Sequence, residues 1–377
     1  MGGYHKDALP RGHHLVDYEI ESLLGFGGFG ITYLAHDSQL GAKVAIKEYL
    51  PQDISGRVEA TKVFPNPDAP NAFQDYHLGL KEFLKEARHL VRFKHPNIVR
   101  VLRYMEANGT AYMVMEYEEG ESLGEYLKRK PGRRLEEKEF LRIFLPVFNG
   151  LGAVHADKIL HLDIKPDNIY LRKDHTPMLI DFGSARQAIT GPDHMQRITL
   201  THGYAPIEQY PGKGDPGPWT DIYAAGASMY FCICGKRPEI SINRYQTILK
   251  HHVDPLVPAT KIGDGHYSRY ILECIDWALQ IYASDRPQSA RELQDALMGK
   301  GIPKPGQVKP SINISGPAYL DTQQGEGRAG RWIVILLVLG ILGGGYYLKP
   351  NLAKEVFAQS GKWVKGQTQE LVKLLKR

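Results

Sequence analysis

The segment that decides the fold is His161-Leu162-Asp163-Ile164-Lys165-Pro166-Asp167-Asn168, which is followed by Met178-Leu179-Ile180-Asp181-Phe182-Gly183. The two segments bring carboxylates, an ammonium group and a side-chain amide into a short length of chain. One such carboxylate alone would usually be a solvated loop residue. The combination at this spacing instead indicates a catalytic site.

A glycine-rich segment lies near the start of the chain. Gly25-Phe26-Gly27-Gly28-Phe29-Gly30 is flanked by residues 18–24 and 31–35, which both have the composition of strands. A dinucleotide-binding fold would need a helix directly after the glycines. The glycines are therefore predicted to join two antiparallel strands. Such a hairpin can close over a phosphate chain, because residues without Cβ let backbone N–H groups approach the oxygens.

A lysine and a glutamate follow this hairpin. Strand alternation in Val44-Ala45-Ile46-Lys47 places Ala45 and Lys47 on one face. The apolar residues of 80–91 have helical spacing, and Glu86 lies at the edge of their face. An inward carboxylate needs a cation, and Lys47 is the available candidate. The alternative is a surface glutamate on an ordinary amphipathic helix.

Together with His95-Pro96-Asn97-Ile98-Val99, these motifs resemble the protein kinase family, in its Ser/Thr branch. The resemblance covers about residues 18–298, with the motifs in the family's order and spacing. Two runs are similar to those of bacterial membrane-attached members, namely Lys47-Glu48-Tyr49-Leu50-Pro51 and Tyr204-Ala205-Pro206-Ile207-Glu208-Gln209-Tyr210. The resemblance implies an α+β, bilobal protein-kinase fold with a β-rich N-lobe and a helical C-lobe.

The family's functional positions can be carried over residue by residue. The resemblance implies ATP as phosphate donor and Mg²⁺ as metal, with Mn²⁺ as a substitute. Asp163 is implied to accept the proton of the substrate hydroxyl, and Lys165 to steady the transferred group. Asn168 and Asp181 are the implied metal ligands. The positions implied to bind the nucleotide are Gly25, Gly27, Gly30, Ala45, Lys47, Glu86, Glu116, Glu118, Asn168 and Asp181.

Further positions match the family's structural landmarks. Lys165 and Thr201 are the residue types found in Ser/Thr kinases, and Met115 stands at the gatekeeper position. Tyr117 lies in the segment that joins the lobes. The remaining matches imply a buried ion pair between Glu208 and Arg286, and an aspartate, Asp221, that holds the catalytic-loop backbone.

Several features depart from the pattern. Leu162 stands where the family usually has an arginine that receives an activation-loop phosphate, so activity is predicted not to need that phosphate. Thr32 replaces the usual valine above adenine. In addition, 38 residues with four prolines separate Lys47 from Glu86, and this stretch is predicted to be a long loop.

Beyond the kinase-like region the composition changes. Residues 300–377 hold 12 Lys/Arg against 4 Asp/Glu, a charge of +8, while residues 1–299 hold 35 against 38, a charge of −3. A large domain without excess positive charge argues against a nucleic-acid binder. The predicted parts are an N-terminal extension (1–16), a kinase domain (17–299, with lobes at about 17–116 and 119–299), a Pro/Gly-rich linker (300–330), a transmembrane helix (331–349) and a basic amphipathic tail (350–377).

The membrane prediction depends on Trp332 to Leu348, seventeen consecutive residues without a charge. This length is near the lower limit of roughly 17–25 residues for crossing a bilayer. A helix buried in the globular domain is the alternative. ATP and Mg²⁺ place the kinase domain in the cytoplasm, so a single-pass protein of the cell (inner) membrane is expected. Gly340 and Gly344 have the small-xxx-small spacing of a homodimer contact.

The function expected from these features is transfer of the ATP γ-phosphate to Ser/Thr hydroxyls of protein substrates, in a membrane-proximal signalling role. A nucleotide-binding pseudokinase scaffold is the alternative, favoured only by Leu162. Lys47, Asp163, Asn168 and Asp181 are all present, which disfavours it.

Overall fold

The computed structural model describes residues 5–183 and 200–301. Within these ranges no helix has the length and apolar character that a membrane crossing needs. The predicted transmembrane helix (331–349) and tail (350–377) lie outside the described residues, as does the linker from residue 302 onward.

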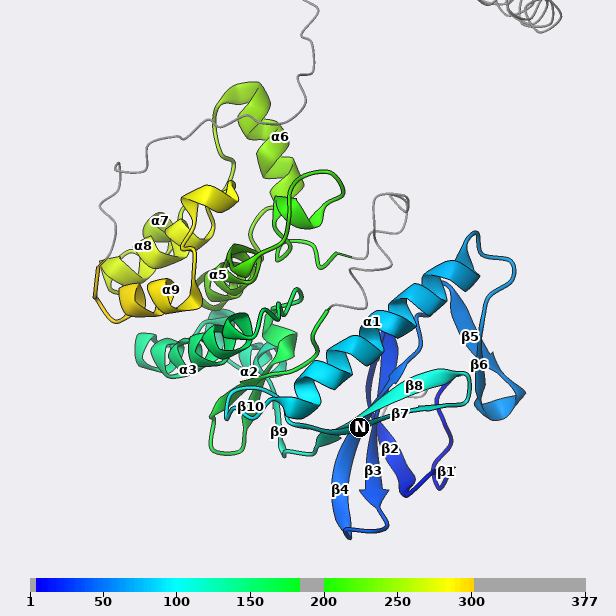
Figure 1. The fold of residues 1–377 in the computed structure, drawn as a ribbon. Helices are drawn as coiled ribbons and strands as arrows, with labels where there is room; N and C mark the ends of the chain where they lie inside the picture. Colours follow the sequence, from blue (N-terminus) through cyan, green and yellow to red (C-terminus); the bar gives the residue numbers. More distant parts are fainter. Residues whose placement is uncertain (1–4, 184–199, 302–377) are drawn as a thin grey trace, which may run out of the picture. The chain divides into compact units, whose positions relative to one another are not determined.

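The N-lobe is a six-stranded antiparallel sheet with the strand order β1-β2-β3-β4-β8-β7. Helix α1 (Ala72–Arg92) crosses one face of it (Figure 1). The strands are β1 (His14–Leu15), β2 (Tyr18–Gly27), β3 (Gly30–Asp37), β4 (Ala42–Tyr49), β7 (Val101–Ala107) and β8 (Thr110–Glu116).

The two faces of this sheet are covered differently. On the face toward α1, Phe83 and Ala87 of the helix belong to a core that continues into the C-lobe. The opposite face carries a second core, in which Leu9 packs with Val44 and Ile46. The predicted alternation along β4 is therefore confirmed. The N-terminal extension helps to cover that face, because Leu9 and Leu15 belong to this second core.

The prediction of a long loop between β4 and α1 was wrong. This stretch contains a two-stranded hairpin, β5 (Ser55–Val58) and β6 (Lys62–Pro65), and α1 already begins at Ala72. The hairpin is tied to the sheet through Val63, which is buried and donates its N–H to the Asn108 carbonyl oxygen at 2.8 Å. The prolines suggested a loop, but Pro65 only ends β6, a position where proline is tolerated.

The C-lobe is mainly helical and surrounds α5 (Pro218–Cys234), which is buried along nearly its whole length. Pro218 at its first position and Gly235 (φ +70°) after its last turn are typical helix boundaries. Gly226 allows close packing on α8 (Arg269–Ala278), because a Cβ there would lie 2.7 Å from the Ala278 side chain. The other elements are α2 (Leu123–Lys128), α3 (Glu137–Ala156), α6 (Ser241–His251), α7 (Ala259–Ile262), α8 (Arg269–Ala278), α9 (Ala290–Leu297) and a small sheet of β9 (Gly120–Ser122), β10 (Ile169–Arg172) and β11 (Pro177–Leu179).

The segment between α1 and β7 binds the C-lobe directly. Asn97 accepts a hydrogen bond from the Leu179 N–H (2.9 Å) and donates its side-chain amide to the Pro177 carbonyl (2.8 Å). Val99 N–H donates to the Leu179 carbonyl (2.9 Å). These bonds hold β11, which leads into Asp181, next to the N-lobe. The predicted bilobal fold is confirmed.

Candidate active site

The glycine-rich segment forms the predicted hairpin. Gly27 pairs with Gly30 at its tip, between β2 and β3. At Gly30 the absence of a side chain serves packing, because a Cβ would lie 2.1 Å from the Glu48 carbonyl oxygen. No described atom lies within 4 Å of a Cβ placed at Gly25 or Gly27. Those two positions leave room for a ligand to approach the backbone.

Residues just after β4 hold this hairpin from behind. Leu50 N–H donates to the Phe29 carbonyl oxygen at 3.1 Å, and Gln52 N–H donates to that of Gly28 at 3.0 Å. The Gln52 side-chain amide also donates to the Gly27 carbonyl oxygen at 3.2 Å. The hairpin tip is therefore positioned by the segment that directly follows the strand of Lys47.

Lys47 forms an ion pair that the sequence did not predict. Its Nζ lies 3.1 Å from Asp181 Oδ1. Glu86 does face inward from α1, as predicted, and is 5% exposed. Lys47 and Asp181, 134 positions apart in the sequence, thus meet in one site.

The catalytic-loop backbone is held by a carboxylate of α5. Asp221 is fully buried and accepts hydrogen bonds from the N–H groups of His161 (2.8 Å) and Leu162 (2.7 Å). His155 lies 2.8 Å from the same carboxylate and, with the backbone donors, keeps the Asp221 pKa below its usual range against the opposing effect of burial. The predicted role of Asp221 in holding this loop is confirmed.

Asp163 lies at the centre of the site. Its carboxylate accepts hydrogen bonds from Lys165 Nζ (2.8 Å), Thr201 Oγ1 (2.8 Å) and Asn168 Nδ2 (2.9 Å). The structure therefore brings together all the catalytic-loop positions expected from the sequence, and it places Thr201 beside them. Asp163 is 8% exposed. A carboxylate with this many donors is held in one orientation, as a proton acceptor must be.

Asn168 lies in the one-turn helix Pro166–Asn168, and its side-chain amide is fixed by the loop. Nδ2 donates to the backbone carbonyl oxygen of Asp163 at 2.8 Å as well as to its carboxylate. Nδ2 also lies 3.5 Å from the Asp181 backbone carbonyl oxygen, so Asn168 is close to both acidic residues. All three of these contacts use Nδ2, which leaves the amide oxygen as a hard oxygen donor for a metal.

Two non-glycine residues of the site have left-handed backbone conformations, Leu162 (φ +65°) and Asp181 (φ +57°). Such conformations are costly for residues with a Cβ and cluster at functional sites. Both are stabilised by contacts already described, Leu162 by Asp221 and Asp181 by Lys47.

His161 connects the catalytic loop to the segment of Asp181. Its Nε2 donates to the Ile180 carbonyl oxygen at 3.0 Å, so Nδ1 is the acceptor that faces the Asp163 N–H at 3.4 Å. The ring stacks on Phe182 with centroids 4.4 Å apart. Burial lowers the pKa of His161, although Asp221 and Asp163 oppose this effect. The neutral imidazole therefore serves as a structural link.

The segment that joins the lobes follows β8. Ala45 pairs with Met115 and Val44 with Glu116, so this end of β8 lies beside the strand of Lys47. The Glu118 carboxylate accepts a hydrogen bond from Arg172 Nε at 2.9 Å. Glu116, which the resemblance implies to bind the nucleotide, therefore lies at the same end of the sheet as Ala45.

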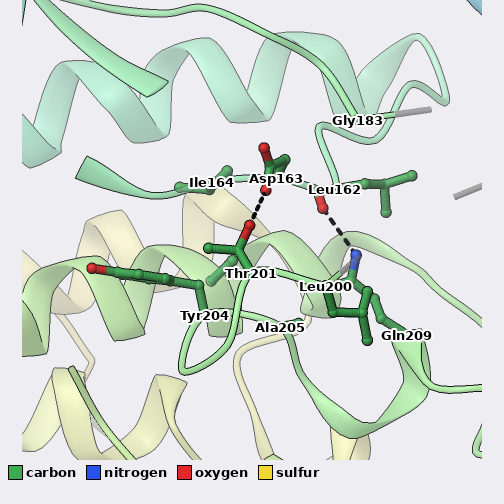
Figure 2. A pocket seen from close by; sticks show the side chains of 10 residues that line it. Leu162, Asp163, Ile164, Gly183, Leu200, Thr201, Tyr204, Ala205 and Gln209 are labelled. Atoms are coloured by element: carbon green, nitrogen blue, oxygen red, sulfur yellow. Dashed lines mark hydrogen bonds between the residues drawn. The ribbon is translucent and has the colours of Figure 1, made fainter. Parts of the chain in front are cut away.

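A pocket lies beside Asp163, between the catalytic loop and the segment that starts at Leu200 (Figure 2). Its lining includes Gln209, a polar residue for which the sequence predicted no role in the site. Gln209 donates its side-chain amide to the Leu162 carbonyl oxygen at 2.9 Å. The only signal for it was its place in the run Tyr204–Tyr210. The neighbouring Glu208 forms the predicted buried pair with Arg286, at 2.7 Å.

Comparison with known proteins agrees with this geometry. A family model described as "Protein kinase domain" matches residues 18–298, and the chain belongs to the protein kinase family. It is 30% identical to the serine/threonine-protein kinase PknA of Nostoc over 298 residues, which are 74% of this chain and 46% of the relative. It is 32% identical to Pkn2 of Myxococcus xanthus, over 73% of this chain and 31% of the relative. The matches thus span less than half the length of these relatives.

Solved structures are also similar. The structure titled "PpkA-294 apo form" is 37% identical, covers 78% of this chain and 100% of its own, and has a TM-score of 0.69. The kinase domain of Mycobacterium tuberculosis PknI is 23% identical with a TM-score of 0.58, which shows the shared fold.

Proposed function

We propose that this protein transfers the γ-phosphate of ATP to serine and threonine hydroxyls of protein substrates. The observation that carries the proposal is the cluster in which Asp163 is bonded by Lys165, Thr201 and Asn168. The ion pair between Lys47 and Asp181 supports it from the N-lobe side. Phosphoryl transfer depends on positioning and charge neutralisation, and these groups supply both.

The residues fit ATP with a divalent cation. Asp181 Oδ1 and the Asn168 amide oxygen would hold the metal, and Lys47 would bind phosphate oxygens once the nucleotide competes for its ammonium group. The described residues contain no cluster of three or more His, Cys, Asp or Glu side chains arranged for a metal. Mg²⁺ typically uses one or two protein oxygens together with phosphate oxygens and water, so the two oxygen donors are sufficient. The bound metal would neutralise phosphate charge.

The catalytic loop provides the acid–base chemistry. Asp163 would accept the proton of the attacking hydroxyl at its carboxylate, which Asn168 and Thr201 hold in place. Lys165 bonds to the same carboxylate and lies 3.4 Å from Thr201 Oγ1. Its ammonium group would stabilise negative charge on the transferred group. Thr201 belongs to the segment of residues 200–210, here called the substrate-side segment because an acceptor peptide would lie on it. Its bond to Asp163 would link acceptor specificity to the catalytic base.

A pseudokinase scaffold is the alternative, and the intact set of charged residues disfavours it. The test is incorporation of labelled γ-phosphate into a generic Ser/Thr substrate protein by wild type and by Asp163→Asn. The matched control is Asp167→Asn, which changes an exposed carboxylate of the same loop. The proposal expects loss of incorporation in Asp163→Asn only. Equal incorporation by wild type and Asp163→Asn would remove Asp163 from its role, and no incorporation by wild type would support the scaffold.

The proposal includes attachment to the cell membrane through residues 331–349, with the kinase domain in the cytoplasm and a membrane-proximal signalling role. The support is the uncharged run between Arg331 and Lys349. The full chain is expected in the membrane fraction after carbonate extraction, and a chain ending at residue 330 in the soluble fraction. Recovery of both in the soluble fraction would contradict the attachment.

A further inference from the structure

Leu162 is held at both of its backbone groups, by two different elements. Its N–H donates to Asp221 of α5, and its carbonyl oxygen accepts from Gln209 (Figure 2). Between these two bonds the residue has φ +65°, a conformation that a leucine does not adopt without support. The next residue is Asp163, so the direction of the proposed base depends on this conformation.

Gln209 extends from a rigid support. Gln209 is 9% exposed and is the last residue of the short helix Ile207–Gln209. The preceding Glu208 is fixed by Arg286 (2.7 Å) and by Thr220 Oγ1 (2.9 Å). Because the backbone of Gln209 is anchored in this way, its side chain fixes the position of the Leu162 carbonyl oxygen.

The segment of residues 201–209 contacts the catalytic loop at both of its ends. Thr201 Oγ1 donates to the Asp163 carboxylate, while the Gln209 amide donates to the Leu162 carbonyl oxygen. Two consecutive catalytic-loop residues are thereby bonded to one substrate-side segment. The loop and the surface on which an acceptor peptide would lie are thus fixed relative to each other.

The side chain of Leu162 cannot provide this link. It is apolar and lines the pocket beside Leu200 and Tyr204, so it offers no charge to a phosphate group. The amide of Gln209 is neutral and contacts the backbone, which makes its bond independent of any phosphate. The alternative is a purely structural role, in which the Gln209 amide only provides the hydrogen bond that a buried carbonyl oxygen needs.

We infer that Gln209 is a positioning residue that holds the catalytic loop in its active conformation without phosphorylation of the preceding segment. This inference rests on the proposed kinase activity. Replacing Gln209 should therefore lower kcat, whereas replacing a buried glutamine elsewhere in the C-lobe should not.

The test compares Gln209→Met with the matched control Gln294→Met. Gln294 is also a buried glutamine, 7% exposed, whose amide donates to the Leu145 carbonyl oxygen (2.8 Å) and to Asn149 (2.7 Å), between α9 and α3. Both variants and wild type are treated with phosphatase, confirmed phosphate-free by mass spectrometry, and assayed for kcat, for KM of ATP and for unfolding in urea.

Gln209→Met is expected to lower kcat about 10- to 100-fold, as small misplacements of a catalytic group do. KM for ATP should stay within about twofold, since Gln209 is not on the nucleotide side, and Gln294→Met should keep the wild-type kcat. Wild type should remain active without phosphate.

A folded Gln209→Met with wild-type kcat would overturn the inference, and so would loss of wild-type activity on phosphatase treatment. If Gln209→Met does not fold, Gln209→Asn takes its place. Its amide remains but is too short for the 2.9 Å bond, so an unchanged kcat would again refute the inference. Absence of activity in untreated wild type would instead refute the proposed kinase function.

Discussion

Lys47 and Glu48 are neighbours on β4, and their side chains point to opposite faces of the sheet. Lys47 is 17% exposed and contacts Asp181, which is 39% exposed. Glu48 is completely buried, and its carboxylate accepts hydrogen bonds from Arg57 (2.5 Å), Tyr33 (2.7 Å) and Tyr112 (2.8 Å). Both form ion pairs, but only the pair of Lys47 can be reached by a ligand.

Lys47 and Asp181 therefore form part of a ligand site, whereas Glu48 is a structural anchor. The cluster around Glu48 is closed by the N-terminal extension, because Leu9 N–H donates to Tyr33 Oη (3.1 Å) and Arg57 Nε to the Asp7 carbonyl oxygen (2.7 Å). Burial and the Glu48 charge raise the pKa of Tyr33, which remains a neutral donor. A carboxylate surrounded in this way cannot exchange partners, whereas Lys47 and Asp181 can.

The largest effect is expected from Arg57→Met. It leaves Glu48 buried without its cation and should lower the free energy of unfolding by about 3–5 kcal/mol. Urea denaturation measures this. The double variant Glu48→Gln/Arg57→Met should recover part of the loss, because the buried charge is gone. Wild-type stability in Arg57→Met would show that Glu48 is not the closed anchor described above.

Lys47→Met is expected to change activity rather than stability. Loss of one charged contact to the reacting phosphates should lower the rate of phosphate transfer about 10²–10³-fold, or about 3–4 kcal/mol in the activation free energy. The midpoint of unfolding should change little. If Lys47→Met instead unfolded as readily as Arg57→Met, the contrast between the two faces of β4 would fail.

The third effect depends on pH and concerns His161. Its pKa in the folded state is lowered, so its contribution to stability is complete above the unfolded pKa of about 6.5 and is lost as the pH falls below that value. The wild type should lose up to about 1.4 kcal/mol per pH unit from this group. Urea titrations between pH 7.5 and 5.5 should show a flatter slope for His161→Phe and the wild-type slope for His266→Phe, which changes an exposed histidine.

The smallest effect is expected from Arg103→Ala. Arg103 pairs with Asp17 at 3.0 Å on the same lobe as Glu48, but the side chains are 47% and 34% exposed. Solvent screening limits such a pair to about 1 kcal/mol or less. A loss in urea denaturation comparable to that of Arg57→Met would mean that burial does not explain the difference between the two ion pairs.

Much of the site could be predicted from the sequence, because its elements are short and their motifs local. The hairpin of Gly25–Gly30, the face of Lys47 and the cluster of Asp163 with Lys165 and Asn168 all depend on residues close together in the chain. The contact of Lys47 with Asp181 was not predicted, because strand alternation gives a face but does not name the groups on that face. That contact depends on how β11 is placed by Asn97.

The insertion and Gln209 show a different limit. Prolines around residues 51–70 concealed a short hairpin whose stability comes from burial of Val63 against the sheet, which no local pattern reports. Gln209 acts through a backbone oxygen 47 positions earlier in the chain. Contacts of one amide with one carbonyl leave no pattern in the intervening sequence.

The family match begins at Tyr18, yet Leu9 and Leu15, which precede it, are only 4% and 3% exposed. A recombinant domain that starts at Tyr18 would lack the apolar residues that cover Val44 and Ile46, and it would expose a hydrophobic surface on the sheet. Soluble expression and crystallisation of this kinase domain should therefore favour a start before His5.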